Sequence, residues 1–135
     1  LEGFKKALAL GGLAYNPSWV FRGEFLEKEG YQAMQAILQM QDQPTALVAQ
    51  DSMAIGAMEA LKRHGKSVPE DLSIVGLDDM EFCRYCGLTT VRQQKDAMGE
   101  AASELLLKII NQESFSPHTI KTTLIQRSSC RRVSR

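Results

Sequence analysis

Apolar and polar positions between residues 44 and 79 predict one strand–helix–strand unit. Residues 46–49 form a short apolar run, which is typical of a strand that is covered on both faces. Apolar residues then recur at helical spacing over residues 52–64, and Gly65 follows them as a residue that can end a helix in a left-handed conformation. A second apolar run, residues 72–77, predicts a neighbouring strand. The two strands must run parallel, because a helical crossover joins them.

The same patterns extend this α/β organisation along the chain. Asp51 or Ser52 can cap the helix of residues 52–64, since either side chain accepts hydrogen bonds from free N–H groups. The remaining predicted elements are a helix at residues 1–8, a strand at 19–25, an amphipathic helix at 27–41, a short extended segment at 88–93, a helix at 97–111 capped by Asp96, and a strand at 119–126.

Polar residues follow both strands of the central unit. Gln50 and Asp51 close the first strand, and Asp78 and Asp79 close the second. In a parallel sheet these positions meet at the edge where ligands bind, and carboxylates there accept hydrogen bonds from neighbouring hydroxyl groups. This placement suits a polyol, a sugar or a nucleoside. The same residues also suit a helix cap and a loop cap, and spacing alone does not separate the two interpretations.

Phe25 closes the predicted strand of residues 19–25 at the same edge. An aromatic side chain at that position can belong to the core, or it can stack on a sugar ring in a crevice.

Two predicted helices carry more apolar surface than one sheet can cover. The helix of residues 52–64 has a second face with Met53, Ile55 and Glu59, and Gly56 permits close approach of another backbone. These four residues predict a subunit interface. The helix of residues 97–111 has a broad apolar face that needs a partner surface.

Composition excludes several classes of function. Sixteen basic and sixteen acidic residues balance, and the basic residues near the C-terminus, Arg127, Arg131, Arg132 and Arg135, are expected to lie in a solvated tail. No run is long and apolar enough to span a bilayer. We find no phosphate-binding loop, nucleophile elbow or metal-ligand spacing, so we expect no enzyme activity, catalytic residue, metal or cofactor.

Three cysteines, an odd number, favour a reducing compartment over a disulfide scaffold. The lone Cys83–Cys86 motif is interpreted as structural or incidental thiols, with a redox or metal role as the alternative.

The ordered segments resemble the effector-binding domain of bacterial repressors of the LacI/GalR family. The matching segments are residues 2–8 (EGFKKAL), 23–34 (from GEF to GYQAM), 44–61 (PTALVAQDSMAIGAMEAL), 68–79 (VPEDLSIVGLDD), 88–93 (LTTVRQ) and 124–129 (LIQRSS). The resemblance implies a periplasmic-binding-protein-like fold of type I. That fold has a three-layer α/β/α arrangement, a parallel Rossmann-like sheet, and two lobes that close on a ligand.

Roles for single residues follow from the resemblance. Asp78 matches the aspartate that binds effector hydroxyls, and Gln50 and Asp51 stand in the family's Ala-Asn-Asp triplet. The resemblance also implies effector contacts for Phe25, Gln93 and Lys95. The helix that carries Ile55 matches the family's dimer interface. Where the family commonly has a proline after its glutamine, this chain has Gln94.

The resemblance also implies a division of the chain. Residues 1–92 would form the C-terminal lobe, residues 93–118 a crossing segment and a helix that belong to the N-terminal lobe, and residues 119–135 a returning strand and tail. Because the helix at residues 1–8 lacks a cap, and because no N-terminal lobe or DNA-reading headpiece has a counterpart here, we expect the chain to be part of a longer protein.

The function expected from the resemblance is cytoplasmic ligand sensing by a homodimeric, DNA-binding transcriptional regulator. Its partners would be a small effector of the sugar, sugar phosphate or nucleoside class and operator DNA, with no membrane. The alternative is a periplasmic sugar-binding protein of a transport system. An upstream signal peptide would favour that alternative, and an upstream helix-turn-helix would exclude it.

Overall fold

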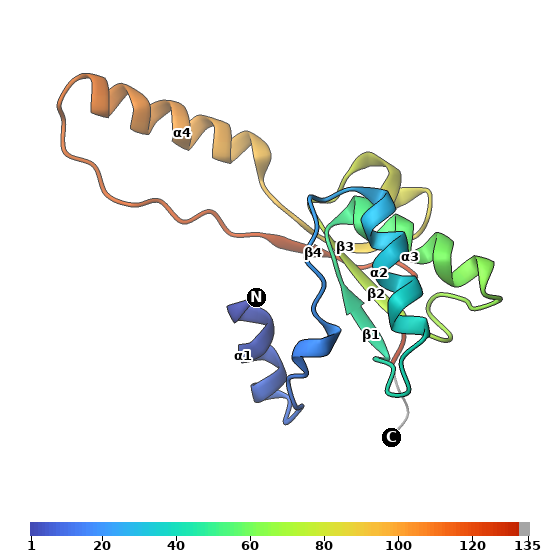
Figure 1. Ribbon diagram of the computed structural model, residues 1–135. Coiled ribbons are helices and arrows are strands. Elements are labelled where there is room, and N and C mark those ends of the chain that lie inside the picture. The colour runs from blue at the N-terminus through green and yellow to red at the C-terminus, as the bar shows by residue number, and fades with distance from the viewer. Residues whose placement is uncertain (133–135) are drawn as a thin grey trace.

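A four-stranded mixed sheet forms the centre of the computed structural model, which describes residues 1–132 (Figure 1). The strand order is β1 (Ala46–Val48), β2 (Ser73–Leu77), β3 (Thr89–Arg92) and β4 (Thr123–Ile125). The first three strands run parallel, and β4 is antiparallel to β3. The helices are α1 (Glu2–Leu10), α2 (Glu27–Leu38), α3 (Asp51–Arg63) and α4 (Lys95–Ile110), with 3₁₀ turns η1 (Pro17–Trp19) and η2 (Glu81–Arg84).

The predicted strand–helix–strand unit is confirmed as β1, α3 and β2. Gly65 takes a φ of +68°, as expected for the residue that ends α3. The helix cap differs from the prediction, because neither Asp51 nor Ser52 caps α3. The side chain of Gln50 does so, accepting a hydrogen bond from the Ser52 N–H at 2.8 Å.

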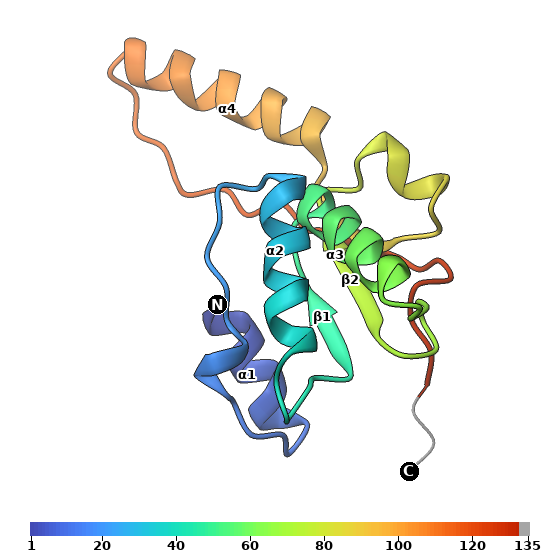
Figure 2. The ribbon, with the colours of Figure 1, turned by 45° about the vertical axis from the view of Figure 1, so that its right-hand side comes forward.

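Two glycines let α2 and α3 pack closely. A Cβ atom on Gly30 would lie 1.9 Å from the Met53 carbonyl oxygen, and one on Gly56 would lie 1.9 Å from the Glu27 carbonyl oxygen. The close approach predicted for Gly56 at a subunit interface therefore occurs within the chain, against α2. Figure 2 shows the two helices side by side.

The core lies between this helix pair and one face of the sheet. Its buried apolar residues are Met34, Ile37, Ala54, Ala57, Ala60, Leu61, Leu72, Ile74, Cys83 and Leu88. On the other face, Val48 and Leu77 are 50% and 40% exposed. The prediction that the first strand is covered on both faces is therefore wrong for this chain.

Ser129 joins two strands of the sheet and is only 2% exposed. Its hydroxyl donates to the Ile74 carbonyl at 2.6 Å and accepts from the Thr89 N–H at 2.8 Å. Its own carbonyl accepts from the Ile74 N–H at 2.8 Å. The segment after β4 is thereby fixed across β2 and β3.

No strand forms over residues 19–25, contrary to the prediction. The carboxylate of Glu29 accepts hydrogen bonds from the N–H groups of Glu24 at 2.6 Å and Leu26 at 3.1 Å. These hydrogen bonds engage two backbone N–H groups at the start of α2, so the same groups do not pair with a neighbouring strand. Phe25 has a φ of +66° and is 66% exposed, so it does not close a strand.

Helix α4 extends away from the rest of the fold in both views (Figures 1 and 2). It begins at Lys95, Asp96 lies in its first turn, and no side chain caps it. None of its residues is buried, and its exposed apolar residues are Met98, Leu106, Leu107, Ile109 and Ile110. The apolar face thus lacks cover from the described residues 1–132, and the division at residues 93 and 118 stays a prediction.

Candidate functional site

Asp78 lies between two of the predicted binding residues, at the carboxyl ends of the parallel strands. The Gln50 side-chain amide donates to Asp78 Oδ2 at 3.3 Å, and the Gln93 side-chain amide donates to Asp78 Oδ1. All three side chains are half-buried. The ends of β1, β2 and β3 thus gather one carboxylate and two amides at one point of the edge.

This cluster can accept further hydrogen bonds. A carboxylate oxygen has capacity beyond the single amide hydrogen that each Asp78 oxygen receives here. The amide oxygen of Gln50 is already engaged by the Ser52 N–H. Asp78 is therefore the strongest acceptor of the cluster for hydroxyl groups of a ligand.

Asp51 lies beneath this edge and not at its surface. Its side chain is fully buried, and both oxygens have protein donors. Oδ1 accepts from the Thr90 hydroxyl at 2.7 Å, and Oδ2 accepts from the Met80 N–H at 2.8 Å. The structure thus places Asp51 as a support of the loop that follows β2.

Asp79 points to a different set of partners from its neighbour Asp78. Its carboxylate forms ion pairs with Arg127 at 2.8 Å and Arg92 at 2.7 Å, and its side chain is only 6% exposed. Burial by itself would raise the pKa of Asp79, but the hydrogen bonds and charges of Arg127 and Arg92 outweigh it and hold the pKa below the usual value.

The expectation of a solvated basic tail is wrong for Arg127, which is half-buried, whereas Arg131 is exposed although it also contacts the protein. Arg127 also donates to the Leu88 carbonyl at 2.7 Å, and Arg131 donates to the Glu70 carbonyl at 2.8 Å. Arg132 is exposed, and Arg135 lies outside the described residues. The sequence contains one signal for the contact of Arg127. Asp79 follows a predicted strand, and a carboxylate that is buried at such a position needs a cation beside it.

The backbone at Asp78 is in an unusual conformation. Its φ is +103°, and Asp79 follows with a φ of +49°. Aspartate tolerates the φ of Asp79 better than the φ of Asp78. A φ such as that of Asp78 costs roughly 1–3 kcal/mol in a non-glycine residue. Such a conformation persists only where the surrounding contacts enforce it.

Two predicted binding residues stand apart from this hydrogen-bonded cluster. Phe25 precedes α2 on an exposed segment instead of ending a strand. Lys95 is exposed at the first position of α4, and within residues 1–132 it has no ion pair with Asp78. Their roles stay predictions from the resemblance.

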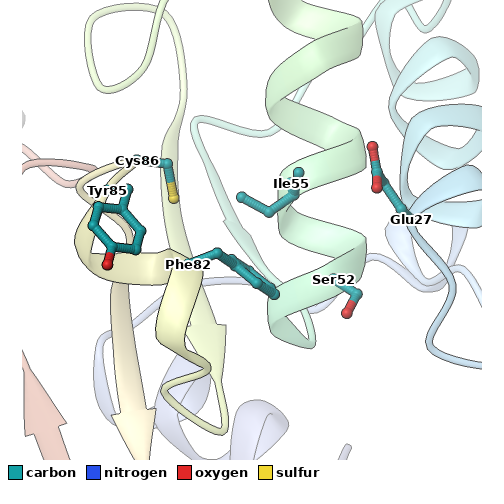
Figure 3. Close-up of a pocket in the computed structure, with 6 residues that line it drawn as sticks. All are labelled: Glu27, Ser52, Ile55, Phe82, Tyr85 and Cys86. Atoms are coloured by element: carbon teal, nitrogen blue, oxygen red, sulfur yellow. The ribbon is translucent and has the colours of Figure 1, made fainter.

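A concave region lies between α3 and η2, outside the Asp78 cluster, and has a volume of about 330 Å³ (Figure 3). Its lining residues are Glu27, Ser52, Ile55, Phe82, Tyr85 and Cys86, and we call this region the α3–η2 groove. Of the four predicted interface residues, Ile55 lines it. Glu59 forms an ion pair with Arg63 at 2.8 Å, and Met53 lies near Gly23, where an added Cβ would be 3.1 Å from its Cε.

The two aromatic residues of this groove, Phe82 and Tyr85, were missed from the sequence. They lie between β2 and β3, in a segment whose sequence has neither a helical nor a strand period. Two aromatic residues in an irregular loop are the one sequence signal for this groove.

The cysteines are free thiols. Burial and the adjacent Asp51 raise the pKa of Cys83 to about 12, so this thiol stays protonated and unreactive near neutral pH. Within residues 1–132 no group of three or more histidine, cysteine or acidic side chains is placed to hold a metal ion. No helix in the same range has the length and apolar character to cross a membrane.

Comparison with known proteins gives a consistent set of relatives. The periplasmic binding protein-like domain family matches residues 1–130. The HTH-type transcriptional repressor PurR of Haemophilus influenzae (strain PittEE) is 39% identical, over 98% of this chain and 42% of the repressor.

Two solved structures support the same grouping. A sugar-binding transcriptional regulator of the LacI family from Escherichia coli, complexed with phosphate, has a TM-score of 0.83 and 34% identity, over 94% of this chain and 47% of that one. The complex of the transcriptional regulator CelR with cellobiose has a TM-score of 0.87 and 31% identity, over 95% and 41%. The chain therefore spans less than half the length of the relatives that it matches.

Proposed function

Because this chain belongs to the periplasmic binding protein-like domain family, within the group formed by LacI-type regulators, we propose that it is the ligand-sensing part of a DNA-binding transcriptional regulator. The observation that carries this proposal is the position of Asp78. Its carboxylate lies at the carboxyl ends of the parallel strands, between the amides of Gln50 and Gln93.

The proposed ligand is a neutral molecule with adjacent hydroxyl groups, such as a sugar or a nucleoside. The two amides hold the Asp78 carboxylate in place, and hydroxyl hydrogens can complete its hydrogen bonding. A phosphate group next to this carboxylate would be repelled, so a phosphorylated ligand would place its phosphate elsewhere. Cellobiose, the ligand of the CelR complex, is a relevant first probe.

In this proposal the ligand acts through a difference in affinity. It binds more tightly to the arrangement in which a second lobe closes over Asp78, and it therefore shifts the population towards that arrangement. Closure would change how the DNA-binding parts of a dimer meet operator DNA. The chain contributes the ligand contacts and the dimer contacts, and its own residues perform no covalent step.

The α3–η2 groove is the proposed dimer surface. It brings the half-buried Ile55 and Phe82 together with Tyr85, which is 77% exposed. Aromatic residues around a concave apolar region are common anchors of protein interfaces. In this proposal the protein is a cytoplasmic regulator. The relatives are transcriptional repressors, so the alternative of a periplasmic transport protein is disfavoured.

The test measures binding of cellobiose, other sugars and nucleosides to the natural protein that carries this chain, by isothermal titration calorimetry. Asp78→Asn keeps the shape but removes the charge, and it should weaken binding of the recognised ligand about tenfold or more. Glu81→Gln removes an equal charge from a side chain that is 75% exposed, and it should leave the affinity unchanged. Equal affinities of all three proteins would contradict the proposal.

A further inference from the structure

A closed set of hydrogen bonds lies directly beneath Asp78. The Asp79 N–H donates to the Thr90 hydroxyl at 3.3 Å, and this hydroxyl donates to Asp51 Oδ1 at 2.7 Å. The other oxygen of Asp51 accepts from the Met80 N–H at 2.8 Å. We call this set the Asp51–Thr90 clamp. It holds two consecutive backbone amides through one hydroxyl and one carboxylate.

The clamp is fully shielded from solvent. Asp51 and Thr90 are both 0% exposed, and each oxygen of the Asp51 carboxylate has a protein donor. A fully satisfied polar network in a buried place fixes geometry strongly, because breaking any member leaves a group without a partner. Asp51 is also the first residue of α3, where the helix dipole favours a negative charge.

Gly76 makes room for the clamp on β2. A Cβ atom at this position would lie 2.1 Å from Asp51 Oδ1 and 3.0 Å from the Thr90 hydroxyl oxygen. Any larger residue would displace the carboxylate. The absence of a side chain at Gly76 therefore leaves the space that the Asp51 carboxylate and the Thr90 hydroxyl occupy.

The clamp acts on the residue that we propose contacts the ligand. The Asp78 N–H donates to the Val91 carbonyl at 2.9 Å, so three consecutive amides, from Asp78 to Met80, are held. Asp78 itself has a φ of +103°. With the next two amides fixed, the chain must turn at Asp78 in a way that directs its carboxylate to Gln50 and Gln93.

We infer that Thr90 is a positioning residue for ligand recognition, because its hydroxyl and Asp51 together force Asp78 into the conformation that presents its carboxylate at the sheet edge. The role of Thr90 in ligand binding rests on the proposed function. Its control over the orientation of Asp78 rests on the structure alone. Thr90 is suited to the role because one hydroxyl is both acceptor and donor in the clamp.

The first experiment needs no ligand. In the isotope-labelled 135-residue chain, NMR would record the side-chain amide signals of Gln50 and Gln93 and the exchange rates of the Asp79 and Met80 amides. Thr90→Val removes the hydroxyl and keeps the shape, so both glutamine signals should move towards those of solvent-exposed amides. The two backbone amides should exchange about tenfold faster. Thr90→Ser restores the hydroxyl and should behave like the wild type.

Ser129→Ala is the matched control for the loss of a buried hydroxyl. It removes the hydroxyl's hydrogen bonds to the Ile74 carbonyl and the Thr89 N–H, neither of which belongs to the clamp, and it should lower the melting temperature without moving the glutamine signals. If Thr90→Val does not fold, Asp51→Asn provides the same readout. It replaces one of the two carboxylate oxygens of Asp51, which accept hydrogen bonds from Thr90 and Met80, with an amide group that cannot accept. Glutamine signals that stay in place in a folded Thr90→Val or Asp51→Asn variant would overturn the inference, as would equal behaviour of Thr90→Val and Thr90→Ser.

The second experiment separates this inference from the proposed function. With the natural protein and cellobiose or the sugar or nucleoside found to bind, Thr90→Val should weaken binding about tenfold and Thr90→Ser should not. Unchanged affinity in Thr90→Val would overturn the inference while the proposed function stands. If no sugar or nucleoside binds the wild type but the NMR result holds, the proposed function fails and the control of Asp78 by Thr90 is supported.

Discussion

Gly30 of α2 and Gly56 of α3 each lie against the backbone of the opposite helix. The added Cβ of either residue would come within 1.9 Å of a carbonyl oxygen of the facing helix. This contact sets the distance between the two helices, and it also fixes the position of α3, whose first residue is Asp51. The helix crossing and the candidate binding edge are therefore parts of one arrangement.

Gly56→Ala should destabilise the fold, because the new methyl group would have to push α2 away. The expected loss in the free energy of unfolding is about 1–3 kcal/mol or more, as for other overpacked cores, measured by urea denaturation. Gly99→Ala is the control, since no atom lies within 4 Å of the added Cβ in α4. It should be neutral or stabilise by up to about 1 kcal/mol. Equal effects of the two substitutions would contradict the packing described here.

Arg127→Met should lower stability by about 2–3 kcal/mol near neutral pH, because it leaves the charge of Asp79 with one cation instead of two. The control Arg84→Met breaks an exposed pair with Glu81 and should cost about 1 kcal/mol or less. Denaturation of the three proteins under the same conditions distinguishes these outcomes. Similar losses for the two variants would show that the contact of Arg127 with Asp79 contributes no more to stability than the exposed pair of Arg84 and Glu81.

The same pair predicts a shift in acid stability. The pKa of Asp79 is below its usual value in the folded chain, so its ionised form stabilises the fold above the pKa of the unfolded state. This stability is lost as the pH falls through the lower, folded pKa. Arg127→Met raises the folded pKa towards the unfolded value, so the variant should lose less stability than the wild type as the pH falls, and the difference in stability between the two proteins should narrow. Parallel stability profiles of the two proteins from neutral to acidic pH would contradict this.

Tyr85→Ser should weaken the proposed homodimer about tenfold or more, since an exposed aromatic residue at an apolar groove is a typical binding hot spot. Analytical ultracentrifugation across a range of concentrations measures the dissociation constant. Leu10→Ser provides the control, because Leu10 is 81% exposed on α1 and does not line the groove. A dimer that is insensitive to Tyr85→Ser would have to use another surface.

Cys83 should resist alkylation in the folded chain. With a pKa of about 12, only about one molecule in ten thousand carries the thiolate at pH 8, and the side chain is fully buried. Cys86, which is half-buried at the α3–η2 groove, should react with iodoacetamide before Cys83 does. Mass spectrometry of tryptic peptides after timed labelling, with and without denaturant, would reveal early labelling of Cys83 if its burial is less complete.

Local patterns predicted the central unit well. The apolar runs of β1 and β2 and the helical period of α3 are strong signals, and the parallel pairing follows from the crossover between them. The ends of these strands also placed Gln50 and Asp78 at one edge, where the structure joins them by a hydrogen bond. Their roles in binding stay predictions.

The structure differs from the predictions where a side chain outside the predicted element decides the local conformation. Residues 19–25 have strand-forming side chains, but the carboxylate of Glu29 uses the backbone donors of Glu24 and Leu26. Asp51 has the chemistry of an N-cap, yet Thr90 and Met80 occupy its oxygens. The partners of Asp51 leave no trace in the spacing of nearby residues, because they lie 29 and 39 positions away, whereas Glu29 lies only five and three positions from the amides that it binds.

The hydrogen bonds of Ser129 have a consequence for protein synthesis. Ser129 lies 55 positions after Ile74 in the sequence, so it leaves the ribosome well after β2 and β3 have been made. Until β4 and Ser129 have emerged, one edge of β3 would remain open to pairing with other chains, and unpaired strand edges promote aggregation. Chaperone binding to nascent chains should accordingly persist until Ser129 has emerged.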